Sequence, residues 1–304
     1  MNFPEARFDP GTGAEPGTRG YVYHDHRIVL AVNVALAVRR PLLVTGVPGS
    51  GKSTLAADVA TRLGWSHVST TITSRTRLED LTARIDSVRR LADAQAKRLK
   101  GDRAYLIPGV LWWAFEPESA ARMANRSEDI HTDLQNAAEG TVVLLDEIDK
   151  AEPDLPNDLL APLDLFKINV PGRTPISAGT HVLFIITSNG ERKMPPAFLR
   201  RCVVLELSDE DPDFFTAVAT SHFGEREDSL YADIAARALK LSRLAKDERR
   251  RRPSMAEYLD TVCASLEFDQ RPPTETTEGT PLWAAIEEAA LRKTRAGADG
   301  ADSA

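Results

Sequence analysis

The sequence predicts an α/β domain built on a parallel β-sheet, followed by a smaller domain made only of helices. Three observations lead to this fold class. The apolar run 41–45 leads into a glycine-rich loop and then into a helical pattern, which together form a strand–loop–helix unit. The unbroken apolar run 141–145 is typical of a parallel strand covered on both faces. From Asp209 onward the composition changes, and apolar residues recur at helical spacing.

The composition is that of an ordinary globular protein of about two domains, with 304 residues, 42% of them hydrophobic and 27% charged. No apolar run approaches the roughly 18 residues that a membrane span needs, and the N-terminus lacks a secretion signal. The two cysteines, Cys202 and Cys263, cannot by themselves form a disulfide framework or a metal cluster. We therefore expect a cytoplasmic protein. The net charge of −7 argues against broad binding to nucleic acid, although a local basic groove stays possible.

The N-terminal part contains a charged arm and a first helix. Residues 1–19 are rich in glycine, proline and charge, which predicts a loose arm, and the main domain is expected to cover 20–208. The apolar spacing in 25–38 predicts a helix packed just ahead of the central strand. Tyr21 and Tyr23 precede it. Packing against this helix is their favoured role, and lining a pocket for a nucleotide base is the alternative.

The glycine-rich loop fits a phosphate-binding pattern. Residues 46–53 carry the required residue at every fixed position of G-x-x-x-x-G-K-[ST]. The flanks supply the context that the motif requires, because a strand precedes the loop and a helix, 54–63, follows it before Gly64. A glycine-rich turn without a ligand is the alternative, and the agreement of both flanks disfavours it.

This loop predicts a site for a nucleotide and Mg²⁺. Backbone N–H groups turn inward around phosphate oxygens, and the helix N-terminus adds the positive end of its dipole. Lys52 supplies a charge to the outer phosphates, and the hydroxyl of Ser53 can bind Mg²⁺. The expected nucleotide-binding residues are Gly46, Pro48, Gly49, Ser50, Gly51, Lys52, Ser53 and Thr54.

The next stretch of the chain alternates between apolar and charged segments. Residues 65–72 are rich in β-branched side chains and predict a second strand, while 73–77 has the pattern of a loop. Residues 78–99 predict a helix dense in charge. Its basic residues form a solvated face in the favoured interpretation, or a rim facing a pore or a partner in the alternative. These basic residues, with one just after the segment, are Arg89, Arg90, Lys97, Arg98 and Lys100. The polar stretch 116–139 is predicted to end in a helix.

Two acidic residues follow the apolar run 141–145. Asp146 and Glu147 are predicted at the carboxyl end of a buried strand, where two carboxylates are costly without a positive partner. A Mg²⁺–nucleotide site supplies that partner. Asp146 is placed to hold Mg²⁺ through water, and Glu147 to polarise the attacking water. The alternative, an acidic turn at the strand exit, is disfavoured by the phosphate loop earlier in the chain.

The following residues predict the rest of the sheet. A helix end at 159–166 precedes a hairpin at 167–176 with Pro-Gly at its turn. A buried strand, 181–187, ends at Ser188-Asn189, and residues 196–201 lead into a short strand at 202–207.

The C-terminal part is predicted to be helical. Residues 209–266 form the expected helical lid, in which Ser254 and Glu257 fit a capping box at the start of a helix. Residues 267–304 are expected to contain a linker rich in proline, threonine and glutamate, then a short helix at 282–292 and a disordered tail.

These motifs, in this order, resemble the AAA+ ATPases and, within them, the MoxR-like group. The resemblance covers about residues 20–266, and it rests on the segments 46–53, 144–149, 186–189, 197–201 and 252–254. It implies a parallel sheet of five strands between helices, with a small helical lid. The hairpin at 167–176 and the long gap between Lys52 and Asp146 also resemble features of this family.

The resemblance implies roles for single residues. Asn189 stands at sensor 1, which helps to orient the attacking water. Arg201 stands at the position of the arginine finger, which reaches the γ-phosphate of a neighbouring subunit, and Arg200 takes this role if the alignment shifts by one. Arg252 stands at the lid arginine called sensor 2, with Arg251 as the alternative.

The implied function is Mg²⁺-dependent ATP hydrolysis in a ring, expected to be a hexamer, that remodels or activates another protein. MoxR-like ATPases commonly act with a partner bearing a von Willebrand factor A domain, which here would be a separate polypeptide. Two alternatives stay open. One is a nucleic-acid remodeller or translocase, supported only by the basic positions between 89 and 100 and opposed by the acidic net charge. The other is a slow-turnover nucleotide switch in a defence or signalling system.

Overall fold

A computed structural model describes residues 8–10, 21–123, 131–133, 139–207, 211–247, 252–273 and 279–292. The predictions for most of the N-terminal arm, for the C-terminal tail and for Arg251 fall outside these residues. The chain forms two compact units. The first contains Met1–Gly11, Asp25–Gly46 and Lys52–Leu207, and the second contains Thr12–His24, Val47–Gly51 and Ser208–Ala304.

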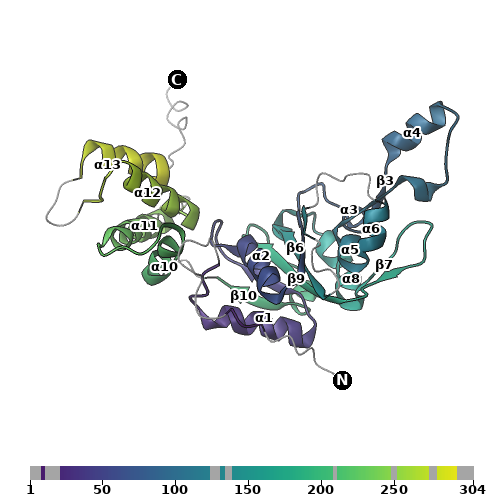
Figure 1. The fold of residues 1–304 in the computed structure, drawn as a ribbon, viewed down its shortest axis with the longest axis horizontal. Coiled ribbons are helices and arrows are strands. Elements are labelled where there is room, and N and C mark those ends of the chain that lie inside the picture. Colours follow the sequence, from purple (N-terminus) through teal and green to yellow (C-terminus); the bar gives the residue numbers. More distant parts are fainter. Residues whose placement is uncertain are drawn as a thin grey trace. The chain divides into compact units, whose positions relative to one another are not determined.

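A six-stranded sheet forms the centre of the first unit (Figure 1). Its strands are β1 (Leu42–Thr45), β2 (Ser66–Thr71), β5 (His131–Asp133), β6 (Gly140–Asp146), β9 (His181–Ser188) and β10 (Val203–Glu206). Their order is β10-β1-β9-β6-β2-β5, and every neighbouring pair is parallel except β2 and β5. The predicted parallel sheet of five strands is therefore confirmed, and β5 adds an antiparallel edge.

The register of the sheet brings the ends of its central strands together. Ile186 of β9 lies between Leu43 of β1 and Leu145 of β6. Since the carboxyl ends of parallel strands lie at the same edge of a sheet, the residues that follow β1, β6 and β9 meet there. These residues are the phosphate loop, Glu147 and Asn189.

Both faces of the sheet are covered. Successive side chains of a strand point to opposite faces, and residues 142–145 of β6 are all buried. Val143 and Leu145 belong to a core that also contains Trp112 of helix α5 (Val110–Phe115). Helix α2 (Lys52–Leu63) contacts β2, β6 and β9, while α1 (His26–Val38) contacts β1 and β10.

Short helices and a hairpin complete the first unit. They are α3 (Leu78–Thr82), α4 (Ser87–Gln95), α6 (Pro117–Met123), α7 (Leu155–Asp158), α8 (Leu160–Leu165) and α9 (Pro196–Leu199), with the 3₁₀ turns η1 (Asp102–Tyr105) and η2 (Ile148–Lys150). The predicted hairpin at 167–176 is present as the antiparallel pair β7 (Lys167–Ile168) and β8 (Ile176–Ser177).

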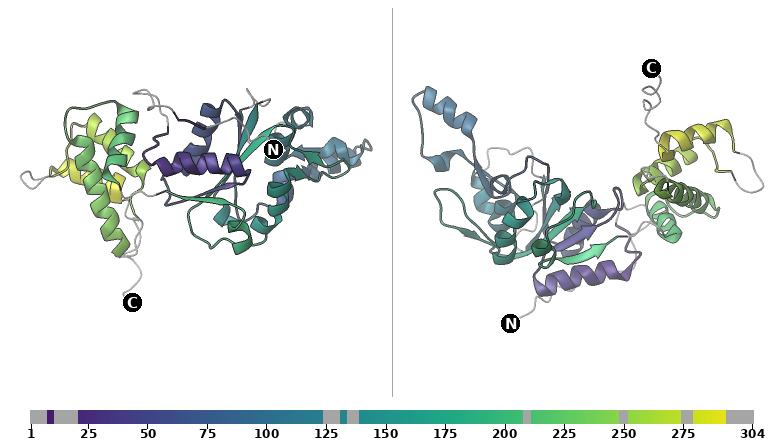
Figure 2. Two further views of the ribbon diagram at one scale, coloured as in Figure 1. Left: turned by 90° about the horizontal axis from the view of Figure 1, so that it is seen from below. Right: turned by 180° about the vertical axis from the view of Figure 1, so that it is seen from behind.

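The single helix predicted over 78–99 is wrong. The chain there forms α3, then strand β3 (Ala83–Ile85), then α4. β3 pairs antiparallel with β4 (Leu106–Pro108), and the Asp86 side chain caps α4 by accepting a hydrogen bond from the backbone N–H of Arg89. Pairing with a distant strand decides this conformation, and local helical spacing cannot reveal it. The result is a ribbon that carries α4 away from the sheet, as Figures 1 and 2 show.

The helix predicted at the end of 116–139 is also wrong in its described part. Residues 131–133 form β5, which pairs with His67, Val68 and Ser69 of β2. A sheet edge offers unpaired backbone N–H and C=O groups, which a polar segment can bind as well as an apolar one. The polar composition of this stretch therefore gave no signal for a strand.

The second unit is helical. It contains α10 (Pro212–Phe223), α11 (Leu230–Asp247), α12 (Met255–Glu267), α13 (Pro281–Ile286) and the π-helical turn η3 (Glu287–Arg292). Phe215, Ile234, Tyr258 and Trp283 are part of its core. The predicted capping box begins α12: the Ser254 hydroxyl accepts a hydrogen bond from the Glu257 N–H, and the Glu257 carboxylate accepts one from the Ser254 N–H at 2.7 Å.

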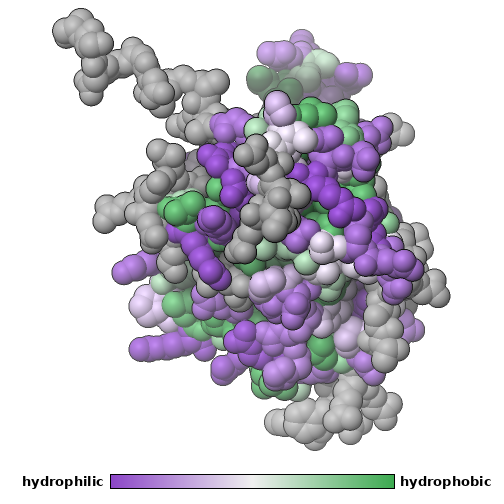
Figure 3. Space-filling model, turned by 90° about the vertical axis from the view of Figure 1, so that its left-hand side faces the viewer, coloured by the Kyte–Doolittle hydropathy of each residue, from purple (hydrophilic) through white to green (hydrophobic). Residues whose placement is uncertain are grey.

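The surface gives no sign of a continuous apolar face in the view of Figure 3. Hydrophilic side chains predominate there, and hydrophobic ones occur in small separate groups. Single exposed apolar residues of this kind are normal on a folded protein. Among the described residues, no helix combines the length and the apolar character that crossing a membrane requires.

Candidate functional site

The phosphate loop leads from β1 into α2. Gly49 and Gly51 have φ angles of 79° and 85°, a left-handed backbone that glycine adopts far more readily than other residues. Because α2 begins at Lys52, the loop ends where free N–H groups and the helix dipole favour an anion. Lys52 is buried, and its ammonium donates a hydrogen bond to the carbonyl of Gly46 at 2.9 Å. The loop thus combines backbone donors with one mobile cation.

The other predicted loop residues have different surroundings. The hydroxyl of Ser50 is buried and has no hydrogen-bond partner among the described residues, so it fits a polar ligand at the loop. Pro48 lies in the turn of the loop. Thr54 lies in the first turn of α2 and is exposed.

Ser53 and Asp146 come together at the carboxyl edge of the sheet. The Ser53 hydroxyl donates a hydrogen bond to Oδ1 of Asp146 at 2.8 Å, and the Thr187 hydroxyl donates to the same oxygen at 2.5 Å. Hydroxyl and carboxylate oxygens are the hard donors that Mg²⁺ prefers, usually beside the phosphates of a substrate. Within the described chain, no group of three or more His, Cys, Asp or Glu side chains could hold a metal alone. The donor set therefore fits a Mg²⁺ ion shared with nucleotide phosphates.

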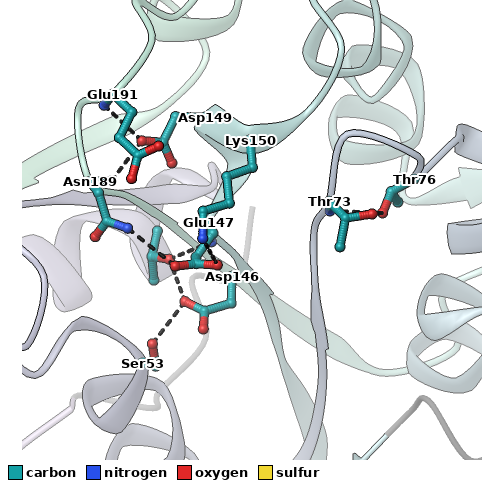
Figure 4. Close-up of polar contacts among 10 residues, drawn as sticks. Ser53, Thr73, Thr76, Asp146, Glu147, Asp149, Lys150, Asn189 and Glu191 are labelled. Carbon is teal, nitrogen blue, oxygen red and sulfur yellow. Dashed lines mark hydrogen bonds and ion pairs between the residues drawn. The ribbon is translucent and has the colours of Figure 1, made fainter. Parts of the chain in front are cut away.

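Glu147 follows β6 in a left-handed backbone conformation, with φ of 61°. Its N–H donates to the Thr187 hydroxyl at 2.9 Å, so Thr187 bonds both acidic neighbours. The carboxylate of Glu147 accepts a hydrogen bond from Nδ2 of Asn189 at 3.3 Å and one from Nζ of Lys150 at 2.7 Å (Figure 4). The hydrogen bond with Glu147 raises the pKa of Lys150. Glu147 is thereby held beside Asp146, where a base for an attacking water is expected.

Asp149 joins the ends of β6 and β9. It is buried, and its Oδ2 accepts hydrogen bonds from the backbone N–H groups of Asn189 at 3.0 Å and Glu191 at 2.9 Å. These two bonds fix the backbone from which the Asn189 side chain reaches Glu147. Figure 4 shows Asp149 beside Asn189 and Glu191, on the far side from Ser53.

Sequence reasoning named no role for Thr187 or Asp149. Both stand inside segments that carried the resemblance, 186–189 and 144–149, but a motif gives no hydrogen-bond partners. A usable signal was present for Asp149, since a carboxylate that follows a buried strand needs donors. For Thr187, a hydroxyl directly after the apolar run 182–186 was the comparable signal.

Arg201 lies away from this group of residues, between α9 and β10. Its guanidinium donates hydrogen bonds to Oδ2 of Asp164 at 2.6 Å and to the carbonyl of Ala197 at 3.3 Å. The side chains of Arg201 and Asp164 are 44% and 41% exposed, and Arg200 is exposed as well. Neither arginine is brought into the hydrogen-bonded group around Glu147.

Arg252 belongs to the second unit and stands two residues before Ser254, the N-cap of α12. Its assignment as sensor 2 stays a prediction, and the alternative, Arg251, lies outside the described residues.

Comparisons with known proteins give one family match and matches to solved structures. The model of the AAA domain, dynein-related subfamily, matches residues 41–202. The Holliday junction branch migration motor RuvB of Thermotoga maritima is 16% identical with a TM-score of 0.44, over 87% of this chain and 67% of that chain. A mutant of the same RuvB protein is also 16% identical, with a TM-score of 0.46, over 87% and 69% of the two chains. No curated protein matches the chain.

Proposed function

Because this chain belongs to the dynein-related subfamily of AAA domains, we propose that it binds ATP with Mg²⁺ and hydrolyses the ATP to ADP and phosphate. The observation that carries the proposal is the convergence of Ser53 from α2, Asp146-Glu147 from β6 and Asn189 from β9 in one hydrogen-bonded group. These elements are far apart in the sequence, and the sheet register brings them to one edge. The phosphate loop follows β1 at the same edge of the sheet.

Each residue has a task that its surroundings support. Backbone N–H groups of the loop and the Lys52 ammonium bind the phosphates. Ser53 and Asp146 would hold Mg²⁺, which offsets phosphate charge when it is bound. Glu147 accepts the proton of the attacking water, and Asn189 holds the Glu147 carboxylate toward it. Thr187 keeps Asp146 and Glu147 in a fixed relation, since it bonds both.

Two substitutions separate binding from turnover. Lys52→Ala should abolish ATP binding in calorimetry, because the phosphates lose their mobile cation. Lys167→Ala, at an exposed lysine of β7, is the matched control and should bind normally. Glu147→Gln should still bind ATP while hydrolysis falls by roughly 10²-fold or more, as for the loss of a general base. Unchanged ATP affinity in Lys52→Ala, or unchanged turnover in Glu147→Gln, would refute the assigned roles.

We also propose that several copies of the chain assemble into a ring. Arg201 is exposed and bonds Asp164, away from the Glu147 group of its own chain, which supports a role in the site of a neighbouring subunit. A hexamer with one site at each interface follows from the resemblance to MoxR-like ATPases. In such a ring, ATP hydrolysis would be coupled to remodelling or activating a separate protein, one that carries a von Willebrand factor A domain. Recovering the proteins bound to Glu147→Gln, loaded with ATP, tests this part.

A slow nucleotide switch is the second candidate. The ion pair of Glu147 with Lys150 favours it, because the ammonium occupies a carboxylate oxygen that would otherwise be open to the attacking water. A nucleic-acid remodeller draws support only from the basic segment that includes α4, against a net charge of −7. The ATPase and the slow switch differ in the rate of ATP turnover. The nucleic-acid remodeller differs from both, because it would bind DNA with an affinity that falls steeply with salt.

A further inference from the structure

Apolar side chains lie exposed on α4 and just after it. Val88 and Leu91 are 81% and 60% exposed, and Leu99 is 55% exposed. Val88 and Leu91 are three positions apart and therefore share one face of the helix. No residue of α4 is buried. Apolar residues at this spacing are typical of a helix that docks its face in a groove of another protein.

Residues 83–108, which are from here on called the arm and are distinct from the N-terminal residues 1–19, contain α4 and fix its position. Where the β3–β4 ribbon meets α4, Tyr105 is buried, and its hydroxyl donates a hydrogen bond to the Asp93 carboxylate of α4 at 3.0 Å. The same hydroxyl accepts a hydrogen bond from the N–H of Lys100 at 2.9 Å. These two hydrogen bonds fix the position of the helix that carries Val88 and Leu91. The helix lies at the end of the β3–β4 ribbon (Figures 1 and 2). A presented surface of this kind has less conformational entropy to lose on binding.

The arm is also basic. It contains seven basic and three acidic residues, a net charge of +4, in a chain whose net charge is −7. Two of its arginines form ion pairs with acids of the arm. The ammonium groups of Lys97 and Lys100 make no hydrogen bond or ion pair with the described residues. A surface that matches the arm therefore combines apolar groups with carboxylates that have no cation of their own.

A pocket in the first unit has this chemistry. It measures about 810 Å³ and lies between the segment after β2, the turn at α7 and the β7–β8 hairpin. Its apolar lining residues are Leu78, Ala83, Leu155 and Pro171, and its acidic ones are Glu79, Glu152, Asp154 and Asp158. Arg75 and Arg77 line it too, and Arg77 lies 4.0 Å from Glu79.

Three of these carboxylates are uncompensated. Glu152, Asp154 and Asp158 are exposed and have no ion-pair partner within the described chain. Like charges gathered at one rim repel one another, and a cation that approaches them is attracted from several ångströms away. Opposite charges at the edge of an interface raise the association rate and select the partner.

We propose that the arm of one copy of this chain docks in the pocket of a neighbouring copy. Val88 and Leu91 then contact the apolar lining, while Lys97 and Lys100 meet the uncompensated carboxylates. The occupant is a second copy because one chain carries both complementary surfaces and cannot join them itself. Ala83, where β3 begins, lines the pocket. From there the ribbon carries α4 away from the sheet (Figures 1 and 2). The contact is head-to-tail, so it closes into a ring or grows as a chain. It does not depend on ATP hydrolysis.

Charge reversal on each side tests this contact. One variant carries Lys97→Glu and Lys100→Glu, and the other carries Glu152→Lys and Asp154→Lys. Sedimentation velocity of the full chain, with ADP throughout, should show an assembly for the wild type that each variant alone has lost. Mixing the two variants should restore the assembly, because each reversed arm then meets a reversed pocket and each wild-type arm meets a wild-type pocket.

Control variants keep the test decisive. Lys240→Glu with Arg243→Glu, at exposed positions of α11, reverses as much charge elsewhere and should assemble normally. Leu91→Gln removes the apolar contact without changing charge and should weaken assembly, with the far-UV circular dichroism unchanged. A monomeric wild type, variants that assemble normally, or a mixture that stays apart would each overturn the proposal. Normal assembly with lost binding to an acidic protein or to DNA would assign the arm to that other partner.

Discussion

The ammonium of Lys150 lies 2.7 Å from Oε2 of Glu147, three residues earlier in the chain. Both belong to the turn that follows β6, and the Lys150 side chain is 42% exposed. In the proposed reaction the Glu147 carboxylate takes a proton from the attacking water. The Lys150 ammonium competes with that water for the same carboxylate, so we expect this contact to slow the proposed hydrolysis.

Lys150→Met should therefore raise ATP turnover. A partly exposed ion pair contributes about 0.2–1 kcal/mol, which corresponds to at most about a fivefold change in rate. Lys150→Arg preserves the charge and should behave like the wild type. Steady-state kinetics at saturating ATP measures both. A marked fall in turnover for Lys150→Met would instead mean that Lys150 assists the reaction.

Thr187→Val should damage both stability and activity. The substitution keeps the shape but removes the hydroxyl that bonds Asp146 and the N–H of Glu147. A buried donor left without a partner costs about 1–3 kcal/mol, which denaturant unfolding would detect. Turnover should fall too, because Glu147 and Asp146 lose their fixed relation. Thr187→Ser restores the hydroxyl and should recover most of both, whereas a neutral Thr187→Val would show that the hydroxyl positions nothing.

Arg201→Ala should bind ATP normally and hydrolyse it slowly. An arginine finger contributes on the order of 10³–10⁵ in rate. Mixing this variant with Lys52→Ala should recover part of the activity, because one chain supplies the phosphate loop and the other supplies the arginine. Asp164→Asn frees the same arginine and is a control that should stay active. An absence of recovery in demonstrated mixed oligomers would assign Arg201 to its own chain.

The second unit should lose stability in acid through Glu287. Burial alone would raise the pKa of this carboxyl, but hydrogen bonds and charges from Arg237 and Arg292 lower it below its usual value of 4.5. Its stabilisation is therefore complete above about pH 5 and is lost as the pH falls through the lowered pKa. Urea unfolding followed by circular dichroism at several pH values measures the slope.

Glu287→Gln is the matched variant for that measurement. It should be less stable than the wild type near neutral pH, by about 1–3 kcal/mol for a charged hydrogen-bonded group, and its stability should change less with acid. Equal slopes for the two proteins would place the acid sensitivity elsewhere.

The parts of the fold that the sequence predicts well are those where one segment contains its own evidence. Residues 41–63 carry an apolar strand, a glycine pattern and a helical face, and the structure has each of them. The capping box at Ser254 and Glu257 is likewise local. Fixed spacing within a short segment is enough for such features.

The parts that were wrong depend on distant partners. β3 and β5 are strands because of β4 and the edge of β2, and neither segment has a strand pattern of its own. The candidate site shows the same limit. The motif predicts Asp146 and Glu147 as site residues, but their link through Thr187 exists only after β6 and β9 pair.

The left-handed backbone at Glu147 has a consequence for the evolution of this protein. A residue with a Cβ in that conformation costs roughly 1–2 kcal/mol, whereas glycine and asparagine adopt it more easily. Random variants selected for heat resistance alone should therefore accumulate glycine or asparagine at position 147. Such variants would be more stable but would lack the Glu147 carboxylate. Selection for stability and selection for the proposed hydrolysis therefore favour different residues at position 147, and comparing variants obtained under each condition would separate the two demands.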